Sequence, residues 1–120
     1  MLMEYAGEGS NLMTLIKENK SQEESLSETD IAKLMFKLIS GISYLHDKGI
    51  CHRDIKPSNT YVTKNLEELK ILDFNVALRF QPNQKLFGAT GEELYSAPEL
   101  TTGKAYDQSV DMWSAGVVLY

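Results

Sequence analysis

The chain has 120 residues, of which 42% are hydrophobic and 24% are charged, and its formal net charge at pH 7 is −5. These fractions are typical of soluble globular proteins and argue against a disordered, fibrous or membrane protein. The acidic balance also argues against nucleic acid as the main partner, because a phosphate backbone attracts basic patches.

Cys51 is the only cysteine, so no internal disulfide can form and a reducing, cytoplasmic (intracellular) setting is expected. No basic segment followed by a long apolar stretch begins the chain, and the longest apolar run, residues 115–120, is too short for a membrane segment. That run resembles an interrupted helix, and the first residues resemble an interrupted strand. We therefore expect a piece of a longer chain, incomplete at both ends, and the sequence does not specify its oligomeric state.

The first quarter of the chain predicts a strand, a short helix and a loop. Residues 1–6 contain β-favouring side chains, and the glycines that follow break the pattern. Ser10 is the expected cap of a short helix over residues 11–19, which has leucine and isoleucine on one face. The polar residues 20–25 predict a loop.

A long amphipathic helix is predicted next. Ser27 and Asp30 form a variant of the capping box, the helix is expected to run to about Asp47, and Gly49 is the expected C-terminal glycine. The apolar positions recur at intervals of three and four residues, which predicts a core-facing helix. These positions are Ile31, Leu34, Met35, Leu38, Ile39, Ile42 and Leu45.

The second half of the chain predicts an α+β arrangement. A loop over residues 50–59 leads to two short strands, near residues 61–62 and 70–72, that form a β-hairpin. A long irregular segment follows over residues 73–99, and irregular segments of this length are usually functional or disordered. From Ser109 the sequence is apolar on several sides, which predicts a buried helix.

Oxygen-bearing side chains flank the predicted hairpin. Asp54 and Asn59 lie in the loop before it, and Asp73 follows its second strand. Because a hairpin returns to its own start, Asp73 is expected beside Asn59, where the two provide oxygen ligands of the kind that Mg²⁺ prefers. Asp54 would be free to accept a proton, and Lys56 would bring a cation to a transferring phosphate.

Several motifs occur in an order and at spacings that resemble a known family. Residues 52–59 read H-R-D-I-K-P-S-N, residues 73–75 read D-F-N, residues 97–99 read A-P-E, and residues 111–116 read D-M-W-S-A-G. These motifs resemble the catalytic loop, the D-F-G motif, the A-P-E motif and the following helix of eukaryotic protein kinases of the serine/threonine type. The resemblance covers residues 1–120 and implies a partial kinase domain: the hinge, the catalytic loop, the activation segment and the start of the next helix, in a mostly helical C-terminal lobe.

The resemblance assigns catalytic roles to the loop residues. It implies that Asp54 is the catalytic base for a substrate hydroxyl and that Lys56 contacts the γ-phosphate of ATP. It also implies that Asn59 and Asp73 hold Mg²⁺. The expected partners are therefore ATP and a protein substrate, and the activity is transfer of phosphoryl groups to serine or threonine.

The same resemblance places the nucleotide site. Met3 falls at the gatekeeper position, and the backbone of Glu4 and Ala6 is expected to hydrogen-bond adenine. Tyr61 occupies a position where a small aliphatic residue normally lies under the adenine ring, so its ring is expected to crowd the nucleotide. Arg53 is expected to pair with a phosphorylated activation segment.

Departures from the family motifs leave a second function open. Asn75 replaces the glycine of D-F-G, a position where an unusual φ angle is expected. Glu92 replaces a threonine that normally contacts the catalytic aspartate, so we expect it to repel Asp54. With Tyr61, these changes motivate the alternative of a catalytically weak pseudokinase that acts as a regulatory binding module.

Other conspicuous residues have a simpler interpretation. We expect His52 to be buried against Phe74 rather than to act in catalysis, and Trp113 to lie in the core. Thr90 is a candidate phosphorylation site in the activation segment, with an exposed threonine of no special role as the equal alternative.

Overall fold

The structure is a computed structural model that describes residues 9–21 and 26–120. The expected strand at residues 1–6, and with it Met3, Glu4 and Ala6, lies outside the described residues.

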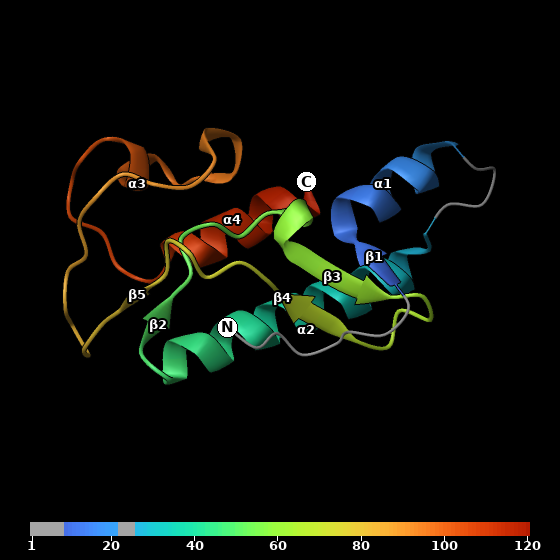
Figure 1. The fold of residues 1–120 in the computed structure, drawn as a ribbon, viewed down its shortest axis with the longest axis horizontal. Helices are drawn as coiled ribbons and strands as arrows, with labels where there is room; N and C mark the ends of the chain where they lie inside the picture. Colours follow the sequence, from blue (N-terminus) through green and yellow to red (C-terminus); the bar gives the residue numbers. More distant parts are fainter. Residues whose placement is uncertain (1–8, 22–25) are drawn as a thin grey trace.

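Within the described residues, helices flank a run of short strands that pair antiparallel, as in an α+β fold (Figure 1). Two further single turns of 3-10 helix occur, at Pro57–Asn59 and Glu93–Tyr95. The elements in chain order are β1 (Gly9–Asn11), α1 (Leu12–Ser21), α2 (Glu28–Asp47), β2 (Ile50–Cys51), β3 (Thr60–Thr63), β4 (Leu69–Ile71), β5 (Leu78–Arg79), α3 (Pro98–Thr101) and α4 (Val110–Leu119).

The long helix α2 begins and ends where its capping residues predict. The hydroxyl of Ser27 accepts a hydrogen bond from the backbone N–H of Asp30 (3.0 Å), and the Asp30 carboxylate lies 3.4 Å from the Ser27 nitrogen. At the other end, Gly49 adopts a φ of +71° just after the helix, a conformation that glycine tolerates well. The predicted capping box and C-terminal glycine are confirmed.

The buried face of α2 is narrower than its apolar stripe. Leu34, Leu38 and Ile42 are buried, whereas Ile31 and Ile39 are 39% and 44% exposed. The buried residues follow one i, i+4, i+8 line, and the exposed pair lies beside it. The sequence therefore predicted the buried line correctly but overestimated its width.

The predicted hairpin is confirmed and is part of a three-stranded sheet with the order β1-β3-β4. Ser10 belongs to β1, where it pairs with Val62, so the prediction that it caps α1 is wrong. Asn11 takes that role because its side-chain oxygen accepts from the N–H of Thr14 (2.9 Å).

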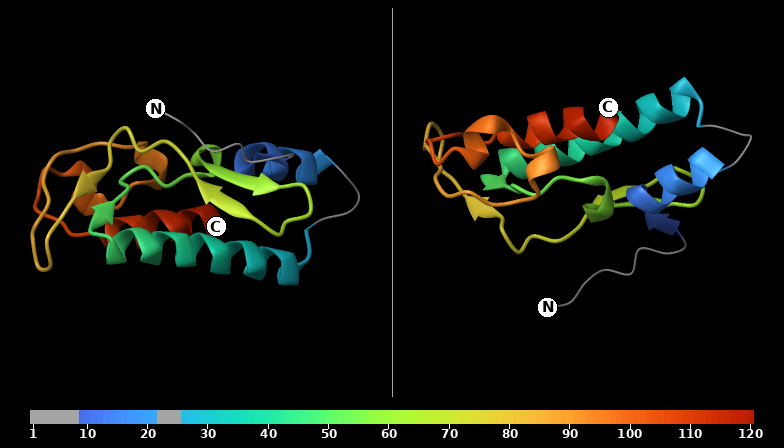
Figure 2. Two further views of the ribbon diagram at one scale, coloured as in Figure 1. Left: turned by 60° about the horizontal axis from the view of Figure 1, so that its bottom comes forward. Right: turned by 90° about the horizontal axis from the view of Figure 1, so that it is seen from above.

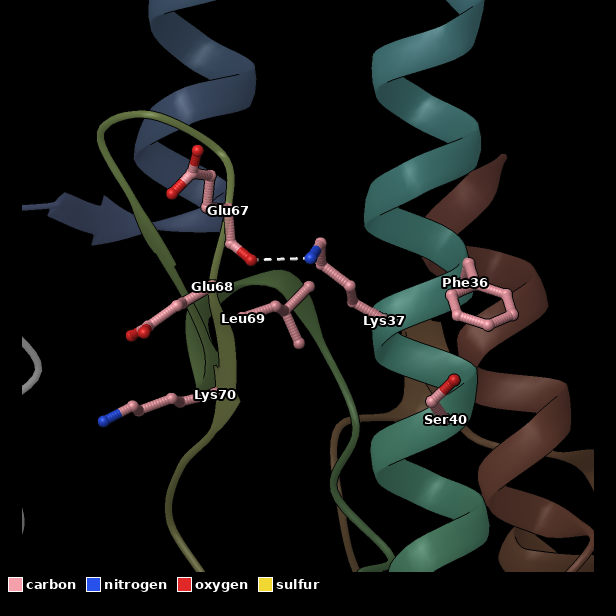
Figure 3. Close-up of a pocket in the computed structure, with 7 residues that line it drawn as sticks. All are labelled: Phe36, Lys37, Ser40, Glu67, Glu68, Leu69 and Lys70. Carbon is pink, nitrogen blue, oxygen red and sulfur yellow. Dashed lines mark hydrogen bonds between the residues drawn. The ribbon is translucent and has the colours of Figure 1, made fainter.

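The hairpin contacts α2 through its connecting turn and its second strand. The ammonium group of Lys37 donates to the carbonyl of Glu67 (2.6 Å), and Leu69 points from β4 toward α2 (Figure 3). Leu69 packs against the two core clusters to which α2 contributes, one with Leu38 and one with Leu34. These contacts place the hairpin along the helix.

The helices α2 and α4 lie side by side (Figure 2). Between them, Leu38 and Ile42 of α2 form a core cluster with Ala115 of α4 and with Ile55, which is 1% exposed. Because Ile55 belongs to the loop between β2 and β3, this cluster fixes the loop to the helical layer.

The predicted buried helix, α4, is buried on one side only, and the expectation that Trp113 lies in the core is wrong. Trp113 is 51% exposed and Met112 is 37% exposed. The buried residues of α4 are Val110, Asp111, Ser114 and Ala115. These four residues share one face of the helix, and the described chain covers that face of α4. In the described residues, no helix is both long enough and apolar enough to cross a bilayer.

Candidate active site

The loop over residues 52–59 holds three of the predicted site residues together. The side-chain nitrogen of Asn59 donates to both the backbone carbonyl and the Oδ2 atom of Asp54, each at 3.0 Å. The ammonium group of Lys56 lies 3.7 Å from the same Oδ2 atom. Ile55, which lies between Asp54 and Lys56 in the sequence, is buried in the core. Its burial anchors the loop at the point from which both polar side chains project.

The chain returns from the hairpin to the same place. The backbone N–H of Leu72 donates to the carbonyl of Asn59 (2.8 Å), and Asp73 is the next residue. Asp73 is exposed, and its Oδ1 atom accepts from the N–H of Asn75 (3.2 Å). The backbone at Asp73 therefore lies beside Asn59, as the hairpin argument required.

These two residues fit the needs of a divalent cation. Asn59 is 8% exposed and uses its amide nitrogen on Asp54, which leaves its amide oxygen for another partner. Asp73 adds an exposed carboxylate. In residues 9–21 and 26–120, no group of three or more His, Cys, Asp or Glu could enclose a metal ion. A small set of protein oxygens suits Mg²⁺, which usually keeps water and phosphate oxygens as its other ligands.

A buried carboxylate in α4 anchors the loop, and the sequence did not reveal this role. Asp111 is completely buried, and it accepts hydrogen bonds from the backbone N–H groups of His52 and Arg53, both at 2.9 Å. Its Oδ2 atom also lies 2.8 Å from Nε2 of His46. The available signal was a charged residue at the start of an otherwise apolar helix, since such a residue is buried only with partners.

His52 is a buried packing residue, as predicted. Its ring is completely buried and meets the ring of Phe74 edge-on, with 4.9 Å between the centroids. Its Nδ1 atom accepts from the N–H of Asp54 (3.1 Å), so Nε2 carries the proton and donates to the carbonyl of Leu72 (2.9 Å). His52 thus links the catalytic loop to the segment that leads into Asp73.

Comparison with known proteins identifies the family. Residues 1–120 match the protein kinase domain. The chain belongs to the protein kinase family. It is 42% identical over 117 residues to the MAP kinase kinase skh1/pek1 of Schizosaccharomyces pombe, an alignment that covers 98% of this chain and 31% of the relative.

Two further relatives are also protein kinases. A probable myosin light chain kinase of Dictyostelium discoideum is 37% identical over 120 residues, which is 100% of this chain and 24% of that protein. The human SNF-related serine/threonine-protein kinase is 39% identical over 116 residues, which is 95% of this chain and 15% of that protein. The chain thus spans less than a third of the length of these relatives.

The unusual backbone angle in the D-F-N motif of this kinase segment lies at Asp73, not at Asn75. Asp73 has a φ of +60°, whereas Asn75 is absent from the positive-φ residues of the described chain. The hydrogen bond from the Asn75 N–H to the Asp73 carboxylate closes a local turn that accommodates this angle. Asparagine at residue 75 therefore does not have to adopt the positive φ angle that glycine tolerates best.

The sequence predicts that Glu92 repels Asp54. In the structure, Lys56 lies near both carboxylates. The carboxylate of Glu92 lies 3.1 Å from the ammonium group of Lys56, which in turn lies 3.7 Å from Asp54. The hydrogen bond with Glu92 raises the pKa of Lys56, burial acts in the opposite direction, and Asp54 adds to the increase. Lys56 is thus placed between two carboxylates and compensates their repulsion.

Tyr61 lies in β3, opposite Lys70 of β4 and Asn11 of β1. Its hydroxyl approaches Gly9 so closely that a Cβ atom at Gly9 would lie 2.9 Å from it. The same Cβ atom would lie 2.2 Å from the carbonyl oxygen of Val62, so glycine at residue 9 mainly allows the backbone of β1 to approach β3. Whether the ring crowds a nucleotide stays a prediction, as do the roles of Met3, Glu4 and Ala6.

One surface hollow of the described residues lies away from the catalytic residues. A hollow between α2 and β4 is lined by Phe36, Lys37 and Ser40 of the helix and by residues 67–70 of the hairpin (Figure 3). It contains none of the predicted catalytic, nucleotide or metal residues.

Proposed function

We propose that the full-length protein containing this segment transfers the γ-phosphoryl group of ATP to serine or threonine hydroxyls of protein substrates. The joined side chains of Asp54, Asn59 and Lys56 are the observation that carries this proposal. A base, a cation and an amide on one anchored loop are the groups that phosphoryl transfer requires.

Each loop residue has a distinct part in this proposal. The Oδ2 atom of Asp54 accepts from Asn59, whereas its Oδ1 atom accepts no hydrogen bond from the described residues. Oδ1 is therefore the atom that accepts the proton of the substrate hydroxyl. The ammonium group of Lys56 compensates negative charge on the transferring phosphoryl group.

Asn59 and Asp73 are the proposed magnesium ligands, and the protein kinase family implies ATP as the phosphoryl donor. A bound Mg²⁺ ion would supply charge neutralisation to the phosphates. The side chain of Asn59 is oriented by its bonds to Asp54, so the same amide links the base to the metal site. An ATP-dependent reaction also fits the intracellular setting that the single cysteine led us to expect.

The test is the replacement of Asp54 by alanine in the full-length protein. We expect kcat to fall by at least ~10²-fold, the usual loss when a general base is removed, while the unfolding temperature changes little. Asp47→Asn is the matched control, because Asp47 is exposed and its side chain makes no hydrogen bond or ion pair with the described residues. A full-length Asp54→Ala protein with the turnover of the wild type would refute the proposal.

The ion pair between Lys56 and Glu92 favours a second candidate function, a catalytically weak pseudokinase that acts as a regulatory binding module. A lysine already paired with a carboxylate offers less charge to a phosphate. Thermal unfolding of the full-length protein with and without Mg-ATP measures nucleotide binding, and a peptide phosphorylation assay measures transfer. Binding without transfer would favour the pseudokinase.

A further inference from the structure

The residue before the catalytic base is tied to the activation segment by uncharged groups. The Nε atom of Arg53 donates to the carbonyl of Val76 (2.7 Å). Its Nη1 atom donates to the hydroxyl of Tyr106 (3.0 Å) and lies 3.5 Å from the carbonyl of Phe87. The guanidinium group therefore bridges the beginning and the middle of the segment over residues 73–99.

Tyr106 holds the other side of this bridge. Its hydroxyl lies 2.7 Å from the carbonyl of Gly88 and 3.2 Å from that of Phe87. One hydroxyl has one proton, so it donates to the nearer carbonyl, that of Gly88, while it accepts from Arg53. Tyr106 is 3% exposed, and its backbone pairs with Leu86 through two hydrogen bonds of 2.7 and 3.0 Å.

The segment meets the catalytic loop again three residues later. Gly91 adopts a φ of +82°, and a Cβ atom there would lie 2.6 Å from the carbonyl oxygen of Arg53. Only glycine allows this approach. The next residue, Glu92, pairs with Lys56. The activation segment thus contacts the loop at Val76, at Phe87 and at Gly91.

We propose that Tyr106 is a positioning residue that holds the activation segment against the catalytic loop through Arg53, so that phosphoryl transfer needs no phosphate on this segment. The inference rests on the function proposed above. A phosphate on a regulatory segment normally acts by adding charge-assisted hydrogen bonds to arginine. Here uncharged oxygens already bind two of the three guanidinium nitrogens of Arg53.

The first test is structural and does not depend on catalysis. Tyr106→Phe in the full-length protein removes the hydroxyl and keeps the ring. Two hydrogen bonds are lost, so we expect the amides of Leu86 and residue 106 to exchange with deuterium about tenfold faster. Tyr44→Phe is the control, because Tyr44 is 63% exposed on α2 and should leave this exchange unchanged. Unchanged exchange in Tyr106→Phe would overturn the inference even if the protein transferred no phosphate.

The second test is catalytic. With Tyr106→Phe, kcat should fall about tenfold while the KM for ATP stays within about twofold, because the hydroxyl acts through Arg53 on the geometry of the loop and not on the nucleotide. Arg53→Lys keeps the positive charge but cannot donate to Val76 and Tyr106 at the same time. Its kcat should also fall while its KM for ATP stays nearly unchanged, and the amides of Leu86 and Tyr106 should also exchange faster. A kcat equal to that of Tyr44→Phe would contradict the role of Tyr106.

The third test concerns phosphate directly. The wild-type protein is treated with a non-specific phosphatase until mass spectrometry finds no phosphate on residues 73–99, which include Thr90. We expect its kcat to remain within about twofold of the untreated protein. A loss of tenfold or more would show that a phosphate positions the segment and would overturn the inference.

Discussion

Asp111→Asn is the substitution that most directly tests how the catalytic loop is anchored. The carboxylate accepts from the N–H groups of His52 and Arg53 at 2.9 Å and contacts His46 at 2.8 Å. Asparagine has nearly the same volume but only one acceptor oxygen, so one backbone N–H would face an amide N–H group. The substitution therefore removes hydrogen bonds without creating a cavity.

The expected loss of stability follows from these contacts. Hydrogen bonds to a charged group contribute about 1.5–3 kcal/mol each, and a buried donor left unpaired costs about 1–3 kcal/mol. Removing one partner from a buried charged network typically costs about 3–5 kcal/mol in total. We therefore expect the free energy of unfolding to fall by about 3–5 kcal/mol, a large part of the usual ~5–15 kcal/mol.

Urea denaturation of the full-length protein measures this loss. With an m value of about 2–3 kcal/mol per M, the midpoint should decrease by about 1–2.5 M. The control Asp47→Asn changes an exposed carboxylate and should shift stability by no more than about 0.5 kcal/mol. If the two variants had the same midpoint, Asp111 would not anchor the loop and the reasoning would be wrong.

The other predictions concern three single groups: the Glu92 carboxylate, the Cys51 thiol and the Ser27 hydroxyl. Glu92→Gln should raise kcat severalfold, because Lys56 would no longer be neutralised by a carboxylate; an unchanged or lower kcat in a steady-state peptide assay would contradict this. Burial, and second to it the charge of Asp111, raise the pKa of the Cys51 thiol. A thiol reagent at pH 8 should therefore modify Cys51 only after the protein is unfolded in urea. Because the folded thiol holds its proton, stability should fall as the pH rises above about 8.5, the pKa of a free thiol, and this loss should be absent in Cys51→Ala. Ser27→Ala should destabilise α2 by about 1 kcal/mol in urea denaturation, and Ser43→Ala, inside the helix, should show no such loss.

The sequence alone was sufficient for features that depend on near neighbours. The limits of α2 follow from Ser27, Asp30 and Gly49, because capping involves residues within one turn of the helix end. The hairpin follows from alternating strands joined by a short turn. The proximity of Asn59 to Asp73 then follows from the hairpin, which returns the chain to its start.

The tertiary structure was needed wherever partners lie far apart in the chain. Arg53 and Tyr106 are 53 residues apart, and Lys56 and Glu92 are 36 apart. No local pattern specifies which oxygen a guanidinium or ammonium group will reach, because that depends on how the irregular segment packs. For the same reason, the sequence predicted a repulsion at Glu92 where the structure shows an ion pair through Lys56.

Composition and motifs by themselves determined the kinase family, the α+β class and the residues that carry the chemistry. They could do so because the catalytic loop is one short run of neighbouring residues, whose order and spacing can be read directly from the sequence. Only the packed chain decided what supports that loop. The buried Asp111 holds its backbone, and α4 leaves Trp113 half exposed while it buries Asp111. The physical reason is that burial and charge compensation are properties of surfaces brought together by folding, and those surfaces come from distant parts of the sequence.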